Sequence, residues 1–263
     1  MECVGVPGNN NLFLMPGHIG LAEYEVTLGI AQELSGSLVT LRNLPGSLYY
    51  LINKTAEKYD AEFVIVDMSP SLGAVNQNLL SISDYFIVPM HPDYFSTMAT
   101  RSLTAVLPKW QSWAKSAAQI QALQEADYPF PKSNPKFLGY VVQKYRPRGG
   151  APSRAFQKWI DQLEVAVNDN LIPALDKCGM LMDRKVYEEV GFNPKEPILQ
   201  MPDFNSLIAR SQEHQVPIFE LTSEQLEQVG RVLETTQGSQ KQFRDLFKAA
   251  AKRVIAMVDA TSA

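Results

Sequence analysis

Hydrophobic and polar positions follow two different periods along the chain. Helical spacing first occurs at Leu21, Tyr24 and Leu28, which would form one apolar stripe of a helix. Uninterrupted apolar runs, rich in β-branched residues, separate such stretches, and runs of this kind are typical of parallel strands that are buried on both faces. The predicted strands lie at 63–67, 85–89, 138–142 and 198–201.

A helical pattern follows each of these runs. Ser47 can cap a helix after the Pro45-Gly46 turn, and Thr222 with Gln225 forms a capping box for a helix to about residue 235. Four repeats of strand, loop and helix predict a doubly wound, mostly parallel α/β sheet with helices around it, in one domain over 1–263. The other predicted helices lie at about 75–82, 95–113, 153–174, 205–214 and 240–258.

Composition narrows the class of protein. The net charge of -4 and the pI near 5.5 argue against a chain that is basic throughout, although they leave a local basic patch open. Cys3 and Cys178 form no disulfide framework and no metal-binding spacing, which fits a reducing cytosol. The first residues do not follow a signal-peptide pattern, and no apolar run approaches the ~18 residues of a spanning helix. We therefore expect a cytoplasmic protein.

In doubly wound sheets, ligands bind where the strands end, so chemistry is expected just after Asp67, Pro89, Val142 and Met201. Asp67 closes an apolar run, and a carboxylate there can hold Mg²⁺ directly or through water, beside a nucleotide's phosphates. The loop from Pro70 to Gly73 could reorganise when a γ-phosphate arrives or leaves. The alternative is that Asp67 only caps the next helix or accepts hydrogen bonds from loop amides.

Several segments resemble the ParA/MinD family of deviant-Walker P-loop ATPases, which includes the Soj-like proteins. The run 59–73 is similar to the Walker B and switch II segment of that family, and Asn76 to Leu80 continues the similarity. The resemblance covers about residues 11–250. Its other segments are 84–89, 91–96, 139–145, 201–203 and 216–218.

The resemblance implies a P-loop NTPase-like fold with ATP and Mg²⁺ as cofactors. Asp67 would serve Mg²⁺ through water, and the switch II loop would include Pro70, Ser71 and Gly73. Gln143 would read the adenine edge, since an amide both donates and accepts hydrogen bonds. The family usually has asparagine at that position, and a solvated glutamine after a strand is the alternative. The residues expected to border the base are Met201, Pro202 and Asp203.

No phosphate-binding loop is found in the sequence. Such a loop needs glycine-rich backbone and a lysine, and the chain contains no Gly-Lys dipeptide. In relatives this loop precedes the segment that Met1 begins here, so we expect an N-terminally incomplete fold. Because phosphoryl transfer loses its positioning groups, we expect no ATP hydrolysis by this chain alone. The chain could be a truncated product, could have moved its strands together, or could borrow a sheet edge from a partner or a second copy.

The C-terminal segment 236–263 predicts a basic amphipathic helix. Its apolar residues recur at helical spacing from Phe243 to Met257, with cations at other positions. Three interpretations remain open: a helix packed on its own domain, a nonspecific DNA-binding surface, or an interfacial membrane helix. Arg146, Arg148 and Arg154 could extend a DNA-binding surface. The candidate DNA-binding residues in the helix are Lys241, Arg244, Lys248, Lys252 and Arg253.

The leading hypothesis is a ParA-like protein that partitions plasmids or chromosomes or positions other cargo, as a nucleotide switch deficient in hydrolysis. It predicts a cytoplasmic, nucleoid-associated homodimer that binds nonspecific DNA and a ParB-like partner, with membrane the less favoured surface. The alternatives are a non-enzymatic dimerising scaffold and a MinD-like or cellulose-synthesis-associated ATPase relative.

Overall fold

The chain divides into two compact units in a computed structural model that describes residues 2–6, 8–34, 39–148 and 151–262. The first unit comprises Met1–Asp84 and Lys109–Pro135. The second comprises Tyr85–Pro108 and Lys136–Ala263. Helix α4 (Tyr94–Ala117) contributes residues to both, and Pro108 lies inside it at the boundary. The expectation of a single domain over 1–263 stays a prediction.

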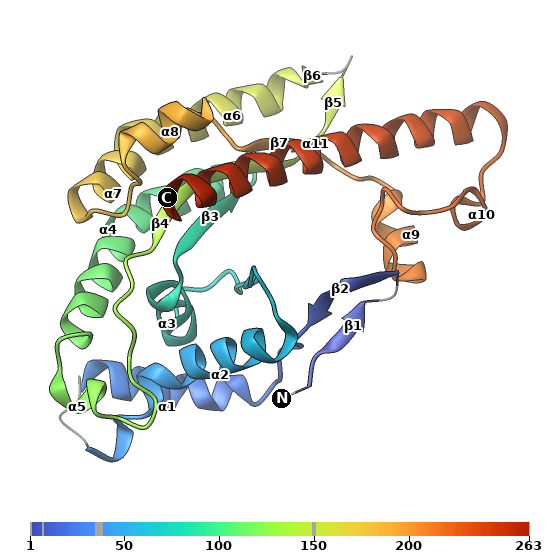
Figure 1. Cartoon of the computed structure of the whole chain (residues 1–263). Helices are drawn as coiled ribbons and strands as arrows, with labels where there is room; N and C mark the ends of the chain where they lie inside the picture. Colours follow the sequence, from blue (N-terminus) through green and yellow to red (C-terminus); the bar gives the residue numbers. More distant parts are fainter. Residues whose placement is uncertain (1, 7, 35–38, 149–150, 263) are drawn as a thin grey trace. The chain divides into compact units, whose positions relative to one another are not determined.

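A three-stranded parallel sheet forms the centre of the second unit (Figure 1). Strand β4 (Lys136–Tyr145) lies between β3 (Tyr85–Met90) and β7 (Leu199–Pro202). Parallel strands need crossover connections, and the long helical segments between these strands provide them. The structure confirms the predicted α/β class, with a parallel sheet flanked by helices and a helical C-terminal end.

Strand β4 is tightly enclosed. Its Gly139 has a φ of +146°, and a Cβ there would lie 2.7 Å from Cγ1 of Ile198, so only glycine fits without a shift. The Tyr187 hydroxyl donates to the Phe137 carbonyl at 2.7 Å. Burial raises the pKa of Tyr187 to about 12, so this donor stays protonated further into the alkaline range than an exposed tyrosine.

The apolar core of the second unit lies between the sheet, α8 (Arg184–Val190) and the long α11 (Gly230–Ser262). Leu138, Met201, Phe243 and Met257 belong to it, so the apolar stripe of the C-terminal helix packs on its own unit. The remaining elements of this unit are β5 (Pro147–Arg148), β6 (Ala151–Pro152), α6 (Arg154–Ala166), the π-helix η2 (Val167–Leu171), α7 (Ile172–Cys178), α9 (Leu207–His214) and α10 (Ser223–Leu226).

Helices dominate the first unit. Ile82, Leu123 and Phe130 form a buried cluster with the end of α4, and the indole of Trp113 donates to the Gln32 carbonyl at 3.0 Å. A small antiparallel hairpin packs against α2, where the rings of Phe13 and Tyr59 lie 4.6 Å apart. The elements are β1 (Val4–Val6), β2 (Asn9–Leu14), α1 (Leu21–Glu33), η1 (Val39–Leu41), α2 (Leu44–Tyr59), α3 (Ala74–Ile82) and α5 (Gln121–Gln124).

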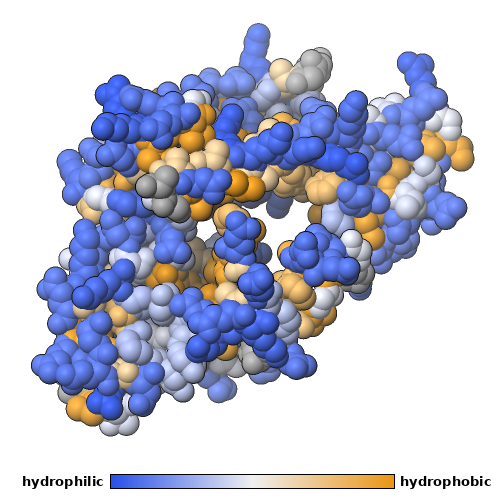
Figure 2. Space-filling view, in the orientation of Figure 1, coloured by the Kyte–Doolittle hydropathy of each residue, from blue (hydrophilic) through white to orange (hydrophobic). Residues whose placement is uncertain are grey.

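The predicted strand at 63–67 is wrong. The segment is irregular, and the side chains from Phe63 to Val66 are exposed, with Ile65 at 92%. Within the described residues, no backbone hydrogen bond joins 63–67 to another strand. A strand needs a neighbour to accept its hydrogen bonds, and the apolar pattern alone does not supply one. Figure 2 shows apolar residues at the surface, among the hydrophilic ones, on the face that it presents.

Several other elements begin or end at residues that differ from the predicted ones. Helix α2 begins at Leu44, so Ser47 lies inside its first turn and donates to the Leu44 carbonyl instead of capping the helix. The Thr222–Gln225 capping box is confirmed, but it opens only the short α10. The helix predicted at 153–174 is interrupted by η2. The hairpins and α8 were not predicted. None of the described helices combines the length and apolar character that crossing a bilayer requires.

The exposure of 63–66 predicts that Ile65→Lys changes the free energy of unfolding by less than about 0.5 kcal/mol, as surface substitutions do. Leu80→Ala in the same unit should cost about 2–5 kcal/mol, because Leu80 is buried. Urea unfolding measures both. An Ile65→Lys cost as large as that of Leu80→Ala would contradict the exposed segment.

Candidate functional site

The loop before α3 is held by one side chain. The amide of Asn76 donates to the carbonyls of Ser69 and Ser71, at 2.6 and 2.7 Å. The Ser69 and Ser71 hydroxyls lie 3.2 Å apart, and Ser69 Oγ is 3.5 Å from Asn76 Oδ1. Because Asn76 is buried on a helix and its partners are exposed, the bridge fixes the loop on a rigid element. The predicted switch loop is thus tethered at a single point.

The start of α3 faces a carboxylate. Gly73 is the N-cap residue, and Oε1 of Glu25 accepts from the Val75 amide at 3.4 Å. A Cβ on Gly73 would overlap the Glu25 carboxylate. Negative charge is stabilised at a helix N-terminus, so Glu25 satisfies this end in place of a side-chain cap. The absence of a side chain at Gly73 lets the loop pass Glu25 closely.

Asp67 is exposed in the irregular segment, and within the described residues its carboxylate makes no hydrogen bond or ion pair. No group of three or more His, Cys, Asp or Glu side chains in the described parts of the chain could hold a metal ion. Mg²⁺ is often bound by one or two carboxylates together with water and substrate phosphates. The role of Asp67 at Mg²⁺ stays a prediction.

The base-binding candidates meet at the carboxyl ends of β4 and β7. Gln143 pairs in register with Met201, and Tyr145 pairs with Pro202. Between them Lys144 has a φ of +60° and forms a bulge. Bulges redirect side chains at strand ends. The Gln143 side chain is half-buried and makes no hydrogen bond within the described residues, and its contact with a base stays a prediction.

Asp203 is fixed by its local turn. Its amide donates to the Tyr145 carbonyl at 2.8 Å, and its carboxylate accepts from the Asn205 amide at 2.9 Å. Asn205 has a φ of +51°, which asparagine tolerates in such turns. The structure thus gathers Gln143, Met201, Pro202 and Asp203 at one end of one sheet. Asp67 and the loop from Pro70 to Gly73 belong to the other unit, and a cleft shared by both groups stays a prediction.

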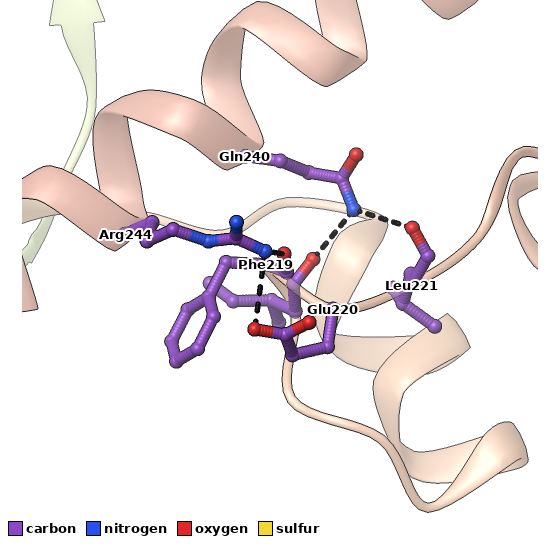
Figure 3. Close-up of polar contacts among 6 residues, drawn as sticks. Phe219, Glu220, Leu221, Gln240 and Arg244 are labelled. Atoms are coloured by element: carbon purple, nitrogen blue, oxygen red, sulfur yellow. Dashed lines mark hydrogen bonds and ion pairs between the residues drawn. The ribbon is translucent and has the colours of Figure 1, made fainter.

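Two of the cations predicted to contact DNA have partners inside their own unit. Arg244 donates to the Phe219 carbonyl at 2.6 Å and pairs with Glu220 at 3.1 Å (Figure 3). Gln240, one turn earlier on the same helix, donates to the carbonyls of Ile218 and Leu221. Arg253 donates to the Ile198 carbonyl at 2.8 Å and lies over the Phe192 ring. These contacts fix α11 to the segment 218–221 and to β7.

Lys241, Lys248 and Lys252 differ from these arginines. All three are exposed, and none makes an ion pair within the described residues. Positions 241, 248 and 252 share one side of a helix, where Asp245 also lies. The cationic surface of α11 therefore consists of these lysines and not of all five predicted residues.

Glu25, Asn76 and Gln240 are positioning residues to which the sequence analysis gave no role. Asn76 had a readable signal, a short amide side chain in the first turn of the helix after a Ser-Pro-Ser loop. Glu25 and Gln240 had no such signal, because only folding brings them to their partners. The Val75 amide is 50 residues from Glu25 in the sequence, and the Ile218 carbonyl is 22 residues from Gln240.

Comparisons with known proteins agree with the nucleotide-switch resemblance in part. Residues 2–120 match a family model described as an AAA domain, a family of P-loop ATPase domains that includes ParA/MinD-like proteins. An uncharacterised protein of Methanocaldococcus jannaschii is 29% identical over 177 residues, which are 66% of this chain and 52% of that protein. The chain thus spans about half the length of this relative. No solved structure matches the chain.

The Asn76 bridge predicts that Asn76→Ala destabilises the protein by about 1–3 kcal/mol, since two loop carbonyls lose their donor. The control is Gln77→Ala on the same helix, whose side chain has no hydrogen bond within the described residues and should cost about 0.5 kcal/mol or less. Urea unfolding gives both values, and limited proteolysis should cut near 69–73 faster in Asn76→Ala alone. Equal costs would refute the bridge.

Neighbouring cations on α11 provide a second test. Arg253→Met should cost about 1.5–3 kcal/mol of stability, because it removes a charged donor from the Ile198 carbonyl. Lys252→Met removes the same charge from an exposed position and should stay within about 0.5 kcal/mol. If thermal unfolding showed the reverse order, the internal role of Arg253 would be wrong.

Proposed function

We propose that the chain is a ParA/MinD-like nucleotide-switch protein that partitions DNA or positions another cargo, and that it does not hydrolyse ATP alone. The observation that carries this proposal is the register that aligns Gln143 with Met201 and brings Pro202 and Asp203 to the same sheet end. A half-buried amide suits the edge of a planar base, because it both donates and accepts hydrogen bonds. Met201 and Pro202 are themselves buried, so they would support this strand end rather than cover the base.

The switch itself would be the loop at 69–73. The structure shows the loop with the Asn76 bridge made, and the switch would consist of breaking that bridge. Ligand binding can shift such an equilibrium only if the ligand favours one arrangement. The hydroxyls of Ser69 and Ser71 lie on the same loop, so a bound phosphate could compete for them and for the bridge.

Asp67 would hold Mg²⁺ through water, and the ion would neutralise phosphate charge when a nucleotide is bound. The base side of the nucleotide would contact Gln143. The contribution of this chain's own residues is therefore binding and orientation. The groups that would stabilise phosphoryl transfer are absent from its sequence, because it has no glycine-rich loop with a lysine.

Nonspecific DNA is the partner that α11 favours. Lys241, Lys248 and Lys252 can each neutralise a phosphate. A membrane-lying helix instead needs its apolar stripe at the surface, and here Phe243 and Met257 are buried in the core of the unit. A homodimer, a ParB-like partner and a place on the nucleoid complete the proposal.

A titration with ATP and Mg²⁺ tests the nucleotide part. Because only the base side of the nucleotide would be held firmly, we expect a Kd of roughly 0.1–1 mM. A Kd of about 1 mM corresponds to a binding free energy of about -4 kcal/mol. Gln143→Leu should weaken binding about threefold to tenfold, the effect of one hydrogen bond. Gln212→Leu, an exposed glutamine of the same unit, is the control and should have no effect.

Two results would contradict the proposal. A sub-micromolar Kd would mean that the chain holds phosphates without the expected loop. Equal binding by wild type and Gln143→Leu would remove the base contact, and the alternative of a non-enzymatic scaffold would then be preferred.

A further inference from the structure

Charge is distributed unevenly along this acidic chain. Between Asp127 and Asp161 there is no aspartate or glutamate, although the net charge of the chain is -4. One cation of this stretch, Lys136, is used structurally, since its Nζ donates to the carbonyls of Gly179 and Leu181. The other cations of this stretch in the second unit are Lys144, Arg146, Arg148, Arg154 and Lys158.

The fold brings four of these cations together. The short β5–β6 hairpin returns the chain so that the Ser153 amide donates to the Arg146 carbonyl at 3.1 Å. Arg154 follows Ser153 directly, and Lys158 lies one turn further along α6 on the same side. Lys144 precedes Arg146 at the exposed bulge of β4. We name Lys144, Arg146, Arg154 and Lys158 the basic arm.

The side chains of the basic arm have no anionic partner. All four are exposed, and within the described residues none makes a hydrogen bond or ion pair. Two arginines elsewhere in the unit are paired: Arg184 bonds Glu188 at 2.7 Å, and Arg210 contacts Glu227 at 2.6 Å. The acid that follows the arm on α6, Asp161, accepts a hydrogen bond from Gln157 and makes no ion pair with the arm within the described residues.

The surroundings of the arm favour a polyanion over an apolar partner. Within the described part of the chain, the aromatic Phe156 is only partly exposed, and the exposed residues between the cations are Pro147, Ala151, Ala155 and Gln157. A protein interface would centre on apolar or aromatic anchors, and an interfacial membrane segment would need an exposed apolar side. The first turn of α6 adds backbone N–H groups and the positive end of its dipole, and Ser153 caps it with no side-chain hydrogen bond.

We propose that the basic arm binds the phosphate backbone of a nucleic acid, as a second surface apart from the lysines of α11. The inference rests on the proposed function only in taking DNA as the partner. Cations separated by a hairpin and a helical turn can contact successive phosphates without reading bases, so binding is independent of sequence and falls as salt rises.

The test is a triple variant of the full chain, Arg146→Gln, Arg154→Gln and Lys158→Gln. Glutamine keeps the helix propensity at Arg154 and Lys158, and Arg146 is exposed outside any helix. Circular dichroism should therefore show an unchanged fold. The binding constant K of each protein for duplex DNA of mixed sequence is measured between about 50 and 200 mM salt. The slope of log K against log salt should become shallower by about 2.7, since each lost phosphate contact removes about 0.9.

Two further triple variants make the result specific. Lys177→Gln, Lys185→Gln and Lys195→Gln remove the same charge from other exposed positions of the unit and should leave the slope unchanged. Lys241→Gln, Lys248→Gln and Lys252→Gln should lower the slope independently, because they test the α11 surface.

The outcomes separate the two proposals. If wild type binds DNA and the basic-arm variant keeps the wild-type slope, the inference is overturned and the proposed function stands. If wild type shows no salt-dependent binding, DNA fails as the partner of both surfaces. If the basic-arm variant loses retention by phosphatidylserine vesicles but not by DNA, the arm binds membrane and the nucleic-acid assignment is wrong.

Discussion

Parallel backbone pairing on both edges of β4 is the constraint on which the second unit depends. Its register with β7 fixes Gln143 opposite Met201, and the bulge at Lys144 then allows the Tyr145 carbonyl to accept from Asp203. Gly139 makes the enclosure of this strand possible, because a side chain there would strike Ile198. The polar strand ends that suit a nucleotide base are therefore a consequence of how the central strand is paired.

The same constraint explains what could and could not be predicted from sequence. The strands predicted at 85–89, 138–142 and 198–201 are confirmed at 85–90, 136–145 and 199–202. The Thr222 capping box was also predicted, since such signals lie in adjacent residues. The run at 63–67 carries an equally strong strand signal but has no paired neighbour, and a pattern of apolar residues says nothing about whether one exists. Pairing joins residues distant in sequence, so it is the part of a fold that local patterns specify least.

The candidate site shows a similar division. Gln143 and Pro202 could be placed at strand ends from the sequence, whereas Asp67 closes an apolar run that does not form a strand. The role of Asn76 and the internal use of Arg244 and Arg253 depend on carbonyls that only the folded chain brings near. Helical spacing placed five cations on α11 as equals, whereas packing leaves three lysines in solvent. The basic arm is clearer in sequence, because no acid stands between Asp127 and Asp161.

Amide hydrogen exchange tests the central claim most directly. The account predicts slow exchange for Val141 and Val142, which lie in β4 between two strands, and exchange close to that of an unstructured peptide for Val64, Ile65 and Val66. Protection of Val64–Val66 comparable to that of β4 would contradict it, because that segment would then be a paired strand and the sheet would not be the one described.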